Sequence, residues 1–286
     1  MTSTLAYHET SPAGPSAPIV LSSPHSGRVL PPEVEGLLRV PTRALSVFED
    51  GPTDSIAAAA ALEGAQVLAA HYARAFVDLN RETSEIDPLL CQPSPLLERP
   101  RVNARVLAGL GVIPSRLSGQ PIYKRPLEAQ EVAQRLLLGY HPYHRRLAAL
   151  LVEQCRRHGA ALLIDLHSMP NEVALIRGQP TVDIAIGDRF GKACEPELAD
   201  LAAWELGAAG LQVARNRPYA GGHITERYGR PAEGMSALQL EIRRDLFMDE
   251  RSGRPTRGVE KLQLVLRRLV RRLAAAMDQS PAIAAQ

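Results

Sequence analysis

Two histidines stand at the ends of apolar runs that are typical of buried strands. His25 follows residues 19–21 in APIVLSSPHSG, and His167 follows residues 160–164 in GAALLIDLHSMP. In an open α/β sheet, ligands gather at the carboxyl ends of the strands. Two imidazoles at such positions suit a catalytic zinc, which commonly takes two histidines and one carboxylate and leaves a fourth place to water. Each histidine alone is more typical of a turn or strand cap, but the pair predicts a metal site.

A third ligand for such a metal is offered by the segment VFEDGPTD. Its three acids are Glu49, Asp50 and Asp54. Asp54 also fits a plain role in the first helical turn, where an acid interacts favourably with the helix dipole, so Asp50 fits the ligand role better. The sequence pattern leaves all three acids open as the third metal ligand. Asp165 shares a strand face with His167 and is expected to hold its imidazole.

A second pair of histidines, His141 and His144, lies one helical turn apart in GYHPYHRRL. The spacing places both on one helix face. No nearby acid completes a metal site, so we expect these two residues to start the helix and to pack.

The candidate general base is Glu241, which interrupts the apolar strand pattern of MSALQLEIRRDL. By alternation it faces with Gln239 and opposite to Leu240. A carboxylate in an apolar strand is either paired with a charge or kept for catalysis. Near a metal-bound water, such a group can accept a proton.

Two further segments offer groups for binding a substrate. Asn80 and Arg81 follow an expected strand at 75–79, and an arginine at a strand exit suits bidentate carboxylate binding or a surface salt bridge. The stretch YAGGHITERYGRPAEG is expected to be a loop between strands, either functional or a solvated hairpin. Its polar residues are His223, Arg227, Tyr228 and Arg230.

The elements that must position these groups alternate between strand-like and helix-like patterns. This alternation predicts an α/β fold, with helices on both faces of a largely parallel or mixed sheet. Segment 82–120 is too long for an ordinary connector and is therefore functional or mobile. The expected strands are 19–21, 65–68, 75–79, 160–166, 182–186, 211–214 and 236–242, and the expected helices are 54–62, 127–139, 142–158, 196–209 and 258–277.

Size and composition narrow the class of protein. The 286 residues fit a single domain over 18–278, with a loose lead-in at 1–17 and a frayed tail at 279–286. A formal net charge of +2 does not indicate a nucleic-acid binder. No signal peptide or membrane span is evident, and three widely spaced cysteines suit a reducing cytosol. We therefore expect a cytoplasmic protein that binds neither nucleic acid nor membrane, with its oligomeric state open.

The order of these motifs resembles the N-formylglutamate amidohydrolase family, a relative of the zinc carboxypeptidases and aspartoacylases. The resemblance implies a three-layer α/β/α domain around a mixed, largely parallel sheet, of the zinc-carboxypeptidase-like or phosphorylase/hydrolase-like type. It also implies zinc-dependent hydrolysis of N-formyl-L-glutamate or a close N-acyl amino acid, in amino-acid metabolism. The matching stretches are PHSG at 24–27, the acids at 50 and 54, DLNR at 78–81, DLHS at 165–168, GGHITERYG at 221–229 and ALQLEIRRDLFMDE at 237–250.

The resemblance also assigns roles to particular residues. It makes His25 and His167 zinc ligands, completed by Asp50 or alternatively by Asp54 or Glu49. Glu241 becomes the general base. The substrate-binding residues are then expected to be Asn80, Arg81, His223, Arg227, Tyr228 and Arg243, with Arg81 also holding the oxyanion.

The chain departs from the expected pattern at three places. Arg28 stands three residues after His25, so the His-x-x-Glu pair of the carboxypeptidases is absent. Gly51-Pro52-Thr53 replaces bulkier residues of the Trp or His type, and segment 82–120 matches poorly. Two alternatives therefore stay open: a deacylase or carboxypeptidase-like hydrolase for another N-acyl amino acid or peptide, and a non-catalytic binder of acidic metabolites.

Overall fold

The computed structural model describes residues 6–175 and 181–279. The chain divides into two compact units. The first unit comprises Met1–His8, Pro24–Glu49 and Ala70–Arg146, and the second comprises Glu9–Ser23, Asp50–Ala69 and Leu147–Gln286. The expected single domain over 18–278 stays a prediction.

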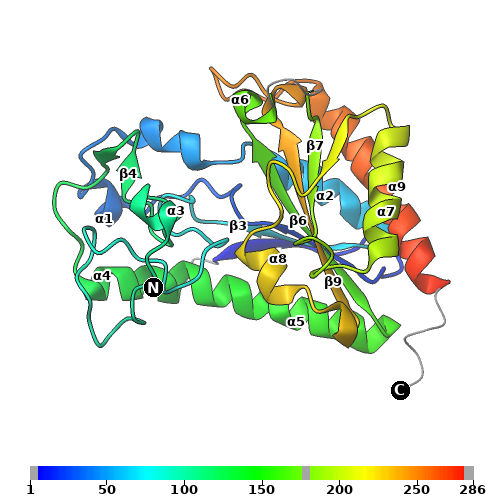
Figure 1. The fold of residues 1–286 in the computed structure, drawn as a ribbon, viewed down its shortest axis with the longest axis horizontal. Helices are drawn as coiled ribbons and strands as arrows, with labels where there is room; N and C mark the ends of the chain where they lie inside the picture. The colour runs from blue at the N-terminus through cyan, green and yellow to red at the C-terminus, as the bar shows by residue number, and fades with distance from the viewer. Residues whose placement is uncertain (1–5, 176–180, 280–286) are drawn as a thin grey trace. The chain divides into compact units, whose positions relative to one another are not determined.

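A seven-stranded mixed sheet has the strand order β1-β3-β2-β6-β9-β7-β8 (Figure 1). Strand β2 pairs in parallel with β3 and β6, β6 with β9, and β7 with β8, whereas β7 and β9 are antiparallel. The mixed, mostly parallel sheet with flanking helices confirms the expected α/β fold class. The strands are β1 (Tyr7–Thr10), β2 (Ile19–Ser23), β3 (Gln66–Ala70), β6 (Ala161–Met169), β7 (Ile184–Gly187), β8 (Val213–Arg215) and β9 (Met235–Arg243).

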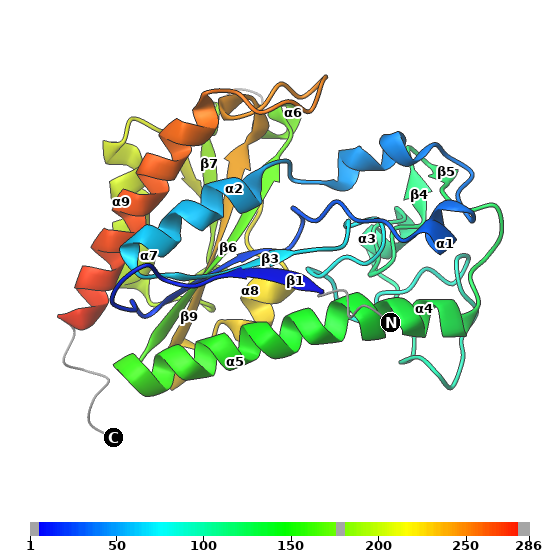
Figure 2. The ribbon, with the colours of Figure 1, turned by 180° about the vertical axis from the view of Figure 1, so that it is seen from behind.

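One face of this sheet is covered by three helical segments (Figure 2). These are α2 (Thr53–Ala58) with its 3₁₀ continuation η2 (Ala59–Glu63), α7 (Pro196–Ala208) and α9 (Gly258–Asp278). The apolar residues of α9 join leucines of β6 and β9 in one buried cluster, so α9 is an outer helix packed on the sheet. The other helical segments of the second unit are α6 (Asn171–Ala174), α8 (His223–Tyr228), η4 (Pro231–Glu233) and η5 (Arg244–Leu246).

The opposite face of β6 and β9 carries polar side chains. Leu238 and Leu240 belong to the apolar cluster, so alternation turns Gln239 and Glu241 to the other face. All four of these residues are buried. Helix α8 lies against β6 and β9. The strands thus keep a polar surface under a helix, which is unusual for a buried sheet face and marks a candidate site.

The first unit contains short elements and ordered loops. They are α1 (Pro32–Glu35), η1 (Thr42–Phe48), α3 (Ala104–Leu107), β4 (Arg116–Leu117), β5 (Gln120–Pro121), α4 (Ala129–Arg135) and a π turn (Leu136–Tyr140). The π turn leads into α5 (His141–His158), whose residues from 147 onward belong to the second unit. Segment 82–120 folds within the first unit, where Ile86, Val112 and Ile113 are buried.

Four expectations about local structure were wrong. Strand β6 continues to Met169, so His167 lies inside the strand and not after its end. Residues 75–79 form a turn, because Phe76 N–H bonds back to Ala73 and Arg74 bonds the carboxylate of Asp78. Residues 223–228 form helix α8 and not a loop. Strand β1 falls within the expected lead-in at 1–17.

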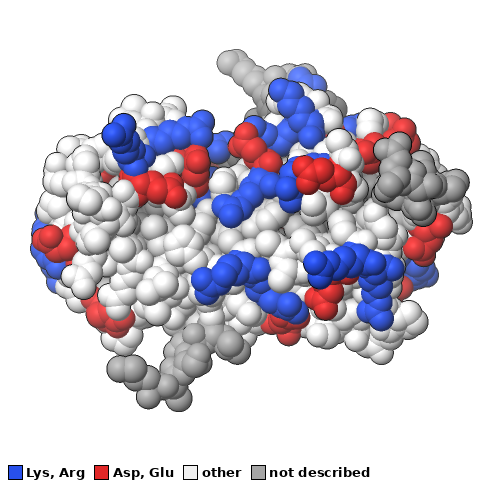
Figure 3. Space-filling view, turned by 90° about the horizontal axis from the view of Figure 1, so that it is seen from below, with Lys and Arg blue, Asp and Glu red and all other residues white. Residues whose placement is uncertain are grey.

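The surface carries both signs of charge. On the face drawn in Figure 3, Lys and Arg are interspersed with Asp and Glu, in keeping with the formal net charge of +2. Among the residues that the structure describes, no helix has the length and apolar character to cross a membrane.

Candidate metal centre and active site

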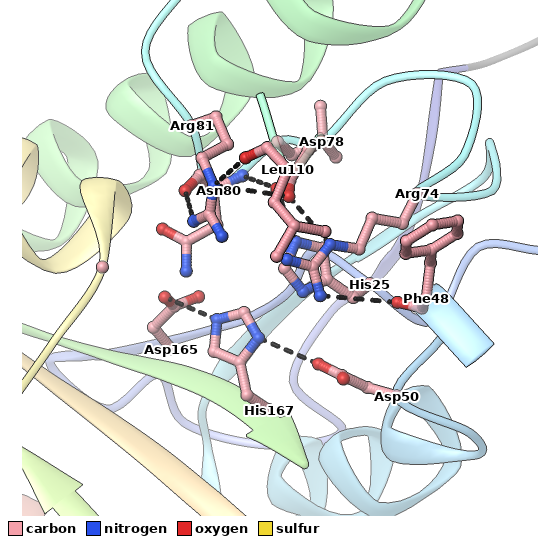
Figure 4. Close-up of polar contacts among 12 residues, drawn as sticks. His25, Phe48, Asp50, Arg74, Asp78, Asn80, Arg81, Leu110, Asp165 and His167 are labelled. Atoms are coloured by element: carbon pink, nitrogen blue, oxygen red, sulfur yellow. Dashed lines mark hydrogen bonds and ion pairs between the residues drawn. The ribbon is translucent and has the colours of Figure 1, made fainter. Parts of the chain in front are cut away.

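His167 lies between two carboxylates in the second unit (Figure 4). Its Nδ1 is 2.9 Å from Oδ2 of Asp50, and its Nε2 is 2.9 Å from Oδ2 of Asp165. All three side chains are at most 3% exposed. Asp165 accepts a further hydrogen bond from the hydroxyl of Ser22, at 3.0 Å. The expected hold of Asp165 on the imidazole is therefore confirmed.

The electrostatics of this cluster favour positive charge on the imidazole. Burial lowers the pKa of His167, but the carboxylates of Asp165 and Asp50 outweigh it and hold the pKa well above its usual value. An environment that stabilises an imidazolium also stabilises a metal cation bound to the same ring. The cluster therefore has the charge of a cation site.

Asp50 is the acid of the 49–54 segment that contacts His167. Its backbone carbonyl accepts a hydrogen bond from the hydroxyl of Ser168 at 3.0 Å, and its Oδ1 lies 3.5 Å from Nη2 of Arg244. Arg244 also donates from Nε to Ser168 Oγ, at 3.0 Å. Asp54 instead stands in the first turn of α2. These contacts fix both the backbone and the carboxylate of Asp50.

His25 lies in the first unit, two residues after the last residue of β2. Its Nε2 is 2.7 Å from Oδ1 of the fully buried Asp78 (Figure 4). Asp78 also accepts from Nε of Arg74 and from the backbone N–H of Asn80, each at 2.8 Å. Burial raises the pKa of Asp78, but Arg74, His25 and Arg81 outweigh it and hold the pKa well below its usual value. Asp78 is thus an anion that fixes the ring of His25.

The two histidines share one arrangement, although they belong to different units. In each, Nε2 is hydrogen bonded to a buried carboxylate, Asp78 for His25 and Asp165 for His167. Metal-ligating histidines commonly have one ring nitrogen held by a carboxylate in this way, which directs the other nitrogen to the metal. His25 in the first unit, and Asp50 and His167 in the second, are each of a residue type that binds metal ions.

Glu241 lies on the strand next to His167. The two are partners in the parallel register of β6 and β9. Gln239 donates from Nε2 to Oε1 of Glu241 at 2.8 Å, and Oε1 of Gln239 accepts from the backbone N–H of Gly222 at 2.7 Å. Glu241 is 8% exposed. The expectation that Gln239 and Glu241 share a face of the strand is confirmed. The carboxylate of Glu241 is therefore held beside the cluster that contains His167.

Asn80 and Arg81 lie in the loop around Asp78 in the first unit. The guanidinium of Arg81 donates to the carbonyls of Asn80 and Leu110, at 2.8 and 3.0 Å. Burial lowers the pKa of Arg81 despite the nearby Asp78. Its Nε also lies 3.8 Å from Oδ2 of Asp78 and 3.9 Å from Oε2 of Glu85, so two carboxylates partly offset its charge.

The remaining predicted residues lie on α8 and β9 in the second unit. Arg243 forms ion pairs with Asp183 at 3.2 Å and Asp245 at 2.7 Å, so protein carboxylates already offset its charge. Arg227 is exposed on α8 and lies 5.7 Å from the ring centre of Tyr228. Burial raises the pKa of Tyr228 to about 12. His223 is the first residue of α8.

The other histidine pair has the expected packing role. His141 begins α5, and His144 is buried with its Nε2 2.9 Å from the carbonyl oxygen of Leu79. The ring of Tyr140 packs on His144, with centroids 4.2 Å apart. Among the described residues, these two histidines belong to no group of His, Cys, Asp or Glu side chains arranged to hold a metal ion.

Three residues of the site were not singled out from the sequence as site residues: Asp78, Ser168 and Arg244. Asp78 and Ser168 stand in DLNR and DLHS, where only neighbouring residues were predicted to act in the site. Arg244 directly follows β9 in the RRDL segment. A buried acid next to an apolar run is the signal that could have identified Asp78.

Comparison with known proteins shows which family this sequence resembles. The family model described as N-formylglutamate amidohydrolase matches residues 17–248. An N-formylglutamate deformylase of Pseudomonas aeruginosa is 34% identical over 236 residues, which cover 81% of this chain and 82% of the relative. One of Pseudomonas putida is 30% identical over the same shares.

Solved structures are also similar to this chain. The crystal structure of N-formylglutamate amidohydrolase from Ralstonia eutropha JMP134 matches with a TM-score of 0.89 and 35% identity, over 96% of this chain and 99% of that one. A gene product of Agrobacterium tumefaciens shares the fold at a TM-score of 0.68 and 19% identity, over 97% and 98% of the two chains. The chain therefore belongs to the N-formylglutamate amidohydrolase family.

Proposed function

We propose that this chain is a zinc-dependent hydrolase of N-formyl-L-glutamate or a close N-acyl amino acid. Water adds across the amide bond, the C–N bond breaks, and the products are the free amino acid and formate or the matching carboxylate. The observation that carries the proposal is the buried row Asp50–His167–Asp165 beside Glu241. The relatives named as N-formylglutamate deformylases support the substrate.

The proposed zinc ligands are His25, Asp50 and His167. Strands β2 and β6 run in parallel with Ser22 opposite Asp165, so the residues that follow in both strands lead toward the same edge of the sheet. Two ligand atoms of a tetrahedral zinc site stand about 3.3 Å apart. The 2.9 Å between His167 Nδ1 and Asp50 Oδ2 is close to this spacing.

The donor set also suits zinc by its chemistry, because imidazole nitrogens and one carboxylate are common in catalytic zinc sites. Zinc, when bound, would supply a Lewis acid that activates water at neutral pH and polarises the amide carbonyl. The carboxylates of Asp78 and Asp165 would fix the two imidazole rings.

Glu241 moves the proton in this proposal. It accepts a proton from the attacking water and then donates it to the nitrogen of the departing amine. Gln239 can hold the carboxylate because its own amide is oriented by the N–H of Gly222. The base therefore keeps one direction through both proton transfers.

The substrate carries two carboxylates, which call for more than one cationic partner. Arg227 is exposed and forms no ion pair with any described carboxylate, so it can offer its charge to a ligand. Arg81 shares its charge with Asp78 and Glu85, but only across 3.8 and 3.9 Å, so part of that charge is still available. Arg243 is the weaker candidate because its two acidic partners are closer, at 3.2 and 2.7 Å. Asn80, His223 and Tyr228 are proposed as their polar neighbours.

The first experiment measures formate release from N-formyl-L-glutamate by metal-stripped protein, with and without added Zn²⁺. Release that depends on zinc supports substrate and metal together. Stoichiometric zinc binding without formate release moves the choice to another N-acyl amino acid or a peptide, which a substrate panel identifies. Binding of N-formyl-L-glutamate with no turnover of any substrate favours a non-catalytic binder and contradicts the proposal.

A further inference from the structure

The first unit contains a hollow that the proposed catalysis does not use. Its volume is about 370 Å³, within the range of roughly 300–1,000 Å³ that is usual for small-molecule sites. Its walls come from the end of the 37–39 segment, from residues 87–90 and from the hairpin of β4 and β5 with the residues that follow it. All of these segments lie in one compact unit.

Local contacts hold the walls of this hollow in place. The β4–β5 hairpin closes through Ser118 and Gly119, which both have positive φ, as a two-residue hairpin turn of type I′ requires. The buried carboxylate of Asp87 accepts from Ser115 Oγ at 2.7 Å and lies 3.2 Å from Nη2 of Arg116. It thereby joins the hairpin to residues 87–90, so the site is preformed.

The lining of the hollow carries an excess of positive charge. Its cations are Arg39, Arg116, Lys124 and Arg125, against the single acid Asp87. Asp87 offsets Arg116, and Glu131, outside the lining, offsets Arg125 through contacts of 2.8 and 2.9 Å.

Two of these cations are not offset by any acid. Within the described residues neither Arg39 nor Lys124 forms an ion pair, and Lys124 Nζ donates only to the carbonyl of Gly36, at 2.9 Å. Both positions are fixed by backbone pairing, because Arg39 N–H donates to Ile122 at 2.7 Å and Lys124 N–H donates to Leu37 at 2.9 Å. The two charges therefore stand on adjoining, paired segments.

Part of the lining is apolar. Leu90 and Tyr123 are buried and contribute to the wall together with Pro121 and Pro126. Tyr123 is held rigidly, because its hydroxyl accepts from Nη1 of Arg135 at 2.7 Å. A ligand would thus meet two uncompensated cations and a short apolar wall.

We propose that this hollow binds a small organic anion with two negative charges, such as a dicarboxylate or a phosphate monoester. Arg39 and Lys124 bind the two charges, and Leu90 and Tyr123 contact the carbon chain. Such a ligand suits this hollow because the two cations are already in place and no acid of the described protein competes with the ligand for them. The site is distinct from the residues proposed for catalysis and does not depend on that proposal.

The test is isothermal titration calorimetry, which measures the affinity of the whole protein for glutarate and for inorganic phosphate. The variant Arg39→Ala/Lys124→Ala is compared with Arg43→Ala/Arg99→Ala, which removes the same charge from exposed positions in the same unit that do not line the hollow. We expect the first variant to weaken binding of at least one probe by about tenfold or more, and the second to leave it nearly unchanged. Lys124→Gln, which keeps most of the side chain, should weaken binding by a smaller factor.

Four results would overturn the proposal. They are no binding of either probe to the wild type, equal weakening in both double variants, binding of the uncharged glutaramide as tight as that of glutarate, and no weakening in Lys124→Gln. Turnover of N-formyl-L-glutamate is measured in parallel. Wild-type turnover in the pocket variant shows that the lost binding is not at the catalytic site, whereas a matching loss of turnover would assign the hollow to that site and refute a separate one.

Discussion

Gln239 and Glu241 are joined by a hydrogen bond whose direction is fixed by the backbone. Gly222 N–H can only donate, so Oε1 of Gln239 must be its acceptor, at 2.7 Å, and the amide nitrogen of Gln239 must face Glu241, at 2.8 Å. The N-terminal end of α8 thus orients the carboxylate of β9 through one side chain. A base with one fixed direction is what repeated proton transfer requires.

Replacing Gln239 by Met should remove this hold while nearly preserving side-chain volume. A hydrogen bond to a charged group is worth about 1.5–3 kcal/mol, so we expect kcat to fall by about 10- to 100-fold. Bound zinc and KM should change little, because the variant touches neither ligand nor substrate group. Steady-state kinetics and metal analysis measure both.

The control is Gln263→Met. Gln263 lies at the surface of α9 and donates a hydrogen bond to the backbone oxygen of Ser55, at 2.9 Å. It should keep wild-type kcat. An unchanged kcat in Gln239→Met would show that Glu241 needs no such orientation.

Glu241→Gln separates metal binding from proton transfer. The amide has nearly the same shape but accepts no proton, so turnover should fall by about 10²–10⁴ while zinc stays bound. The assay is formate release, with zinc content measured on the same sample. Near-full activity would remove Glu241 from the mechanism.

The strand pattern was sufficient to predict some of these relationships. A period of two places Gln239 and Glu241 on one face, and the same rule places Asp165 beside His167. Both predictions needed only residues on a single strand. They are confirmed by hydrogen bonds between side chains two positions apart.

Other features depend on contacts that no local pattern encodes. Asp50 meets His167 across a separation of 117 residues, and Arg244 approaches Asp50 across 194. Four of the five residues at 75–79 are apolar and buried, and burial in a turn gives the same signal as burial in a strand. The length of β6 was underestimated because polar residues such as His167 ended the apolar run before the strand ended.

The choice of acid ligand can be tested directly. Asp50→Asn should abolish stoichiometric zinc binding, because Asp50 Oδ2 lies 2.9 Å from His167 Nδ1. His167→Ala should lose zinc as well. Zinc titration with a competing chelator measures the affinity of each variant.

Asp54→Asn and Glu49→Gln are the matched controls, since each changes one acid of the same short segment. Asp54 lies in the first turn of α2, so its loss should affect helix stability and not zinc. Loss of zinc in Asp54→Asn with retention in Asp50→Asn would reverse the assignment.

The stability that Asp188 contributes is expected to depend on pH. Asp188 is separated in sequence from every proposed zinc ligand. Burial raises its pKa, but hydrogen bonds from Asn216, Arg215 and the backbone N–H of Gly191 outweigh burial and hold the pKa below its usual value. The native state then binds fewer protons than the unfolded chain between the two pKa values. Stability from Asp188 is therefore fully present above the unfolded pKa of about 3.9 and is lost as pH falls through the native pKa.

Asp188→Asn should lower the free energy of unfolding by about 1–3 kcal/mol at pH 7, the scale of hydrogen bonds to a buried charge. The deficit should shrink as the pH is lowered below the unfolded pKa of about 3.9, because the unfolded wild-type chain then binds a proton that native Asp188 binds only at lower pH. Asp200→Asn is the control, since Asp200 pairs with the same Arg215 but is 69% exposed, where solvent screens the pair. Denaturant unfolding at several pH values measures both variants, and a deficit that stays constant down to pH 3 would mean that Asp188 acts through packing and not through its charge.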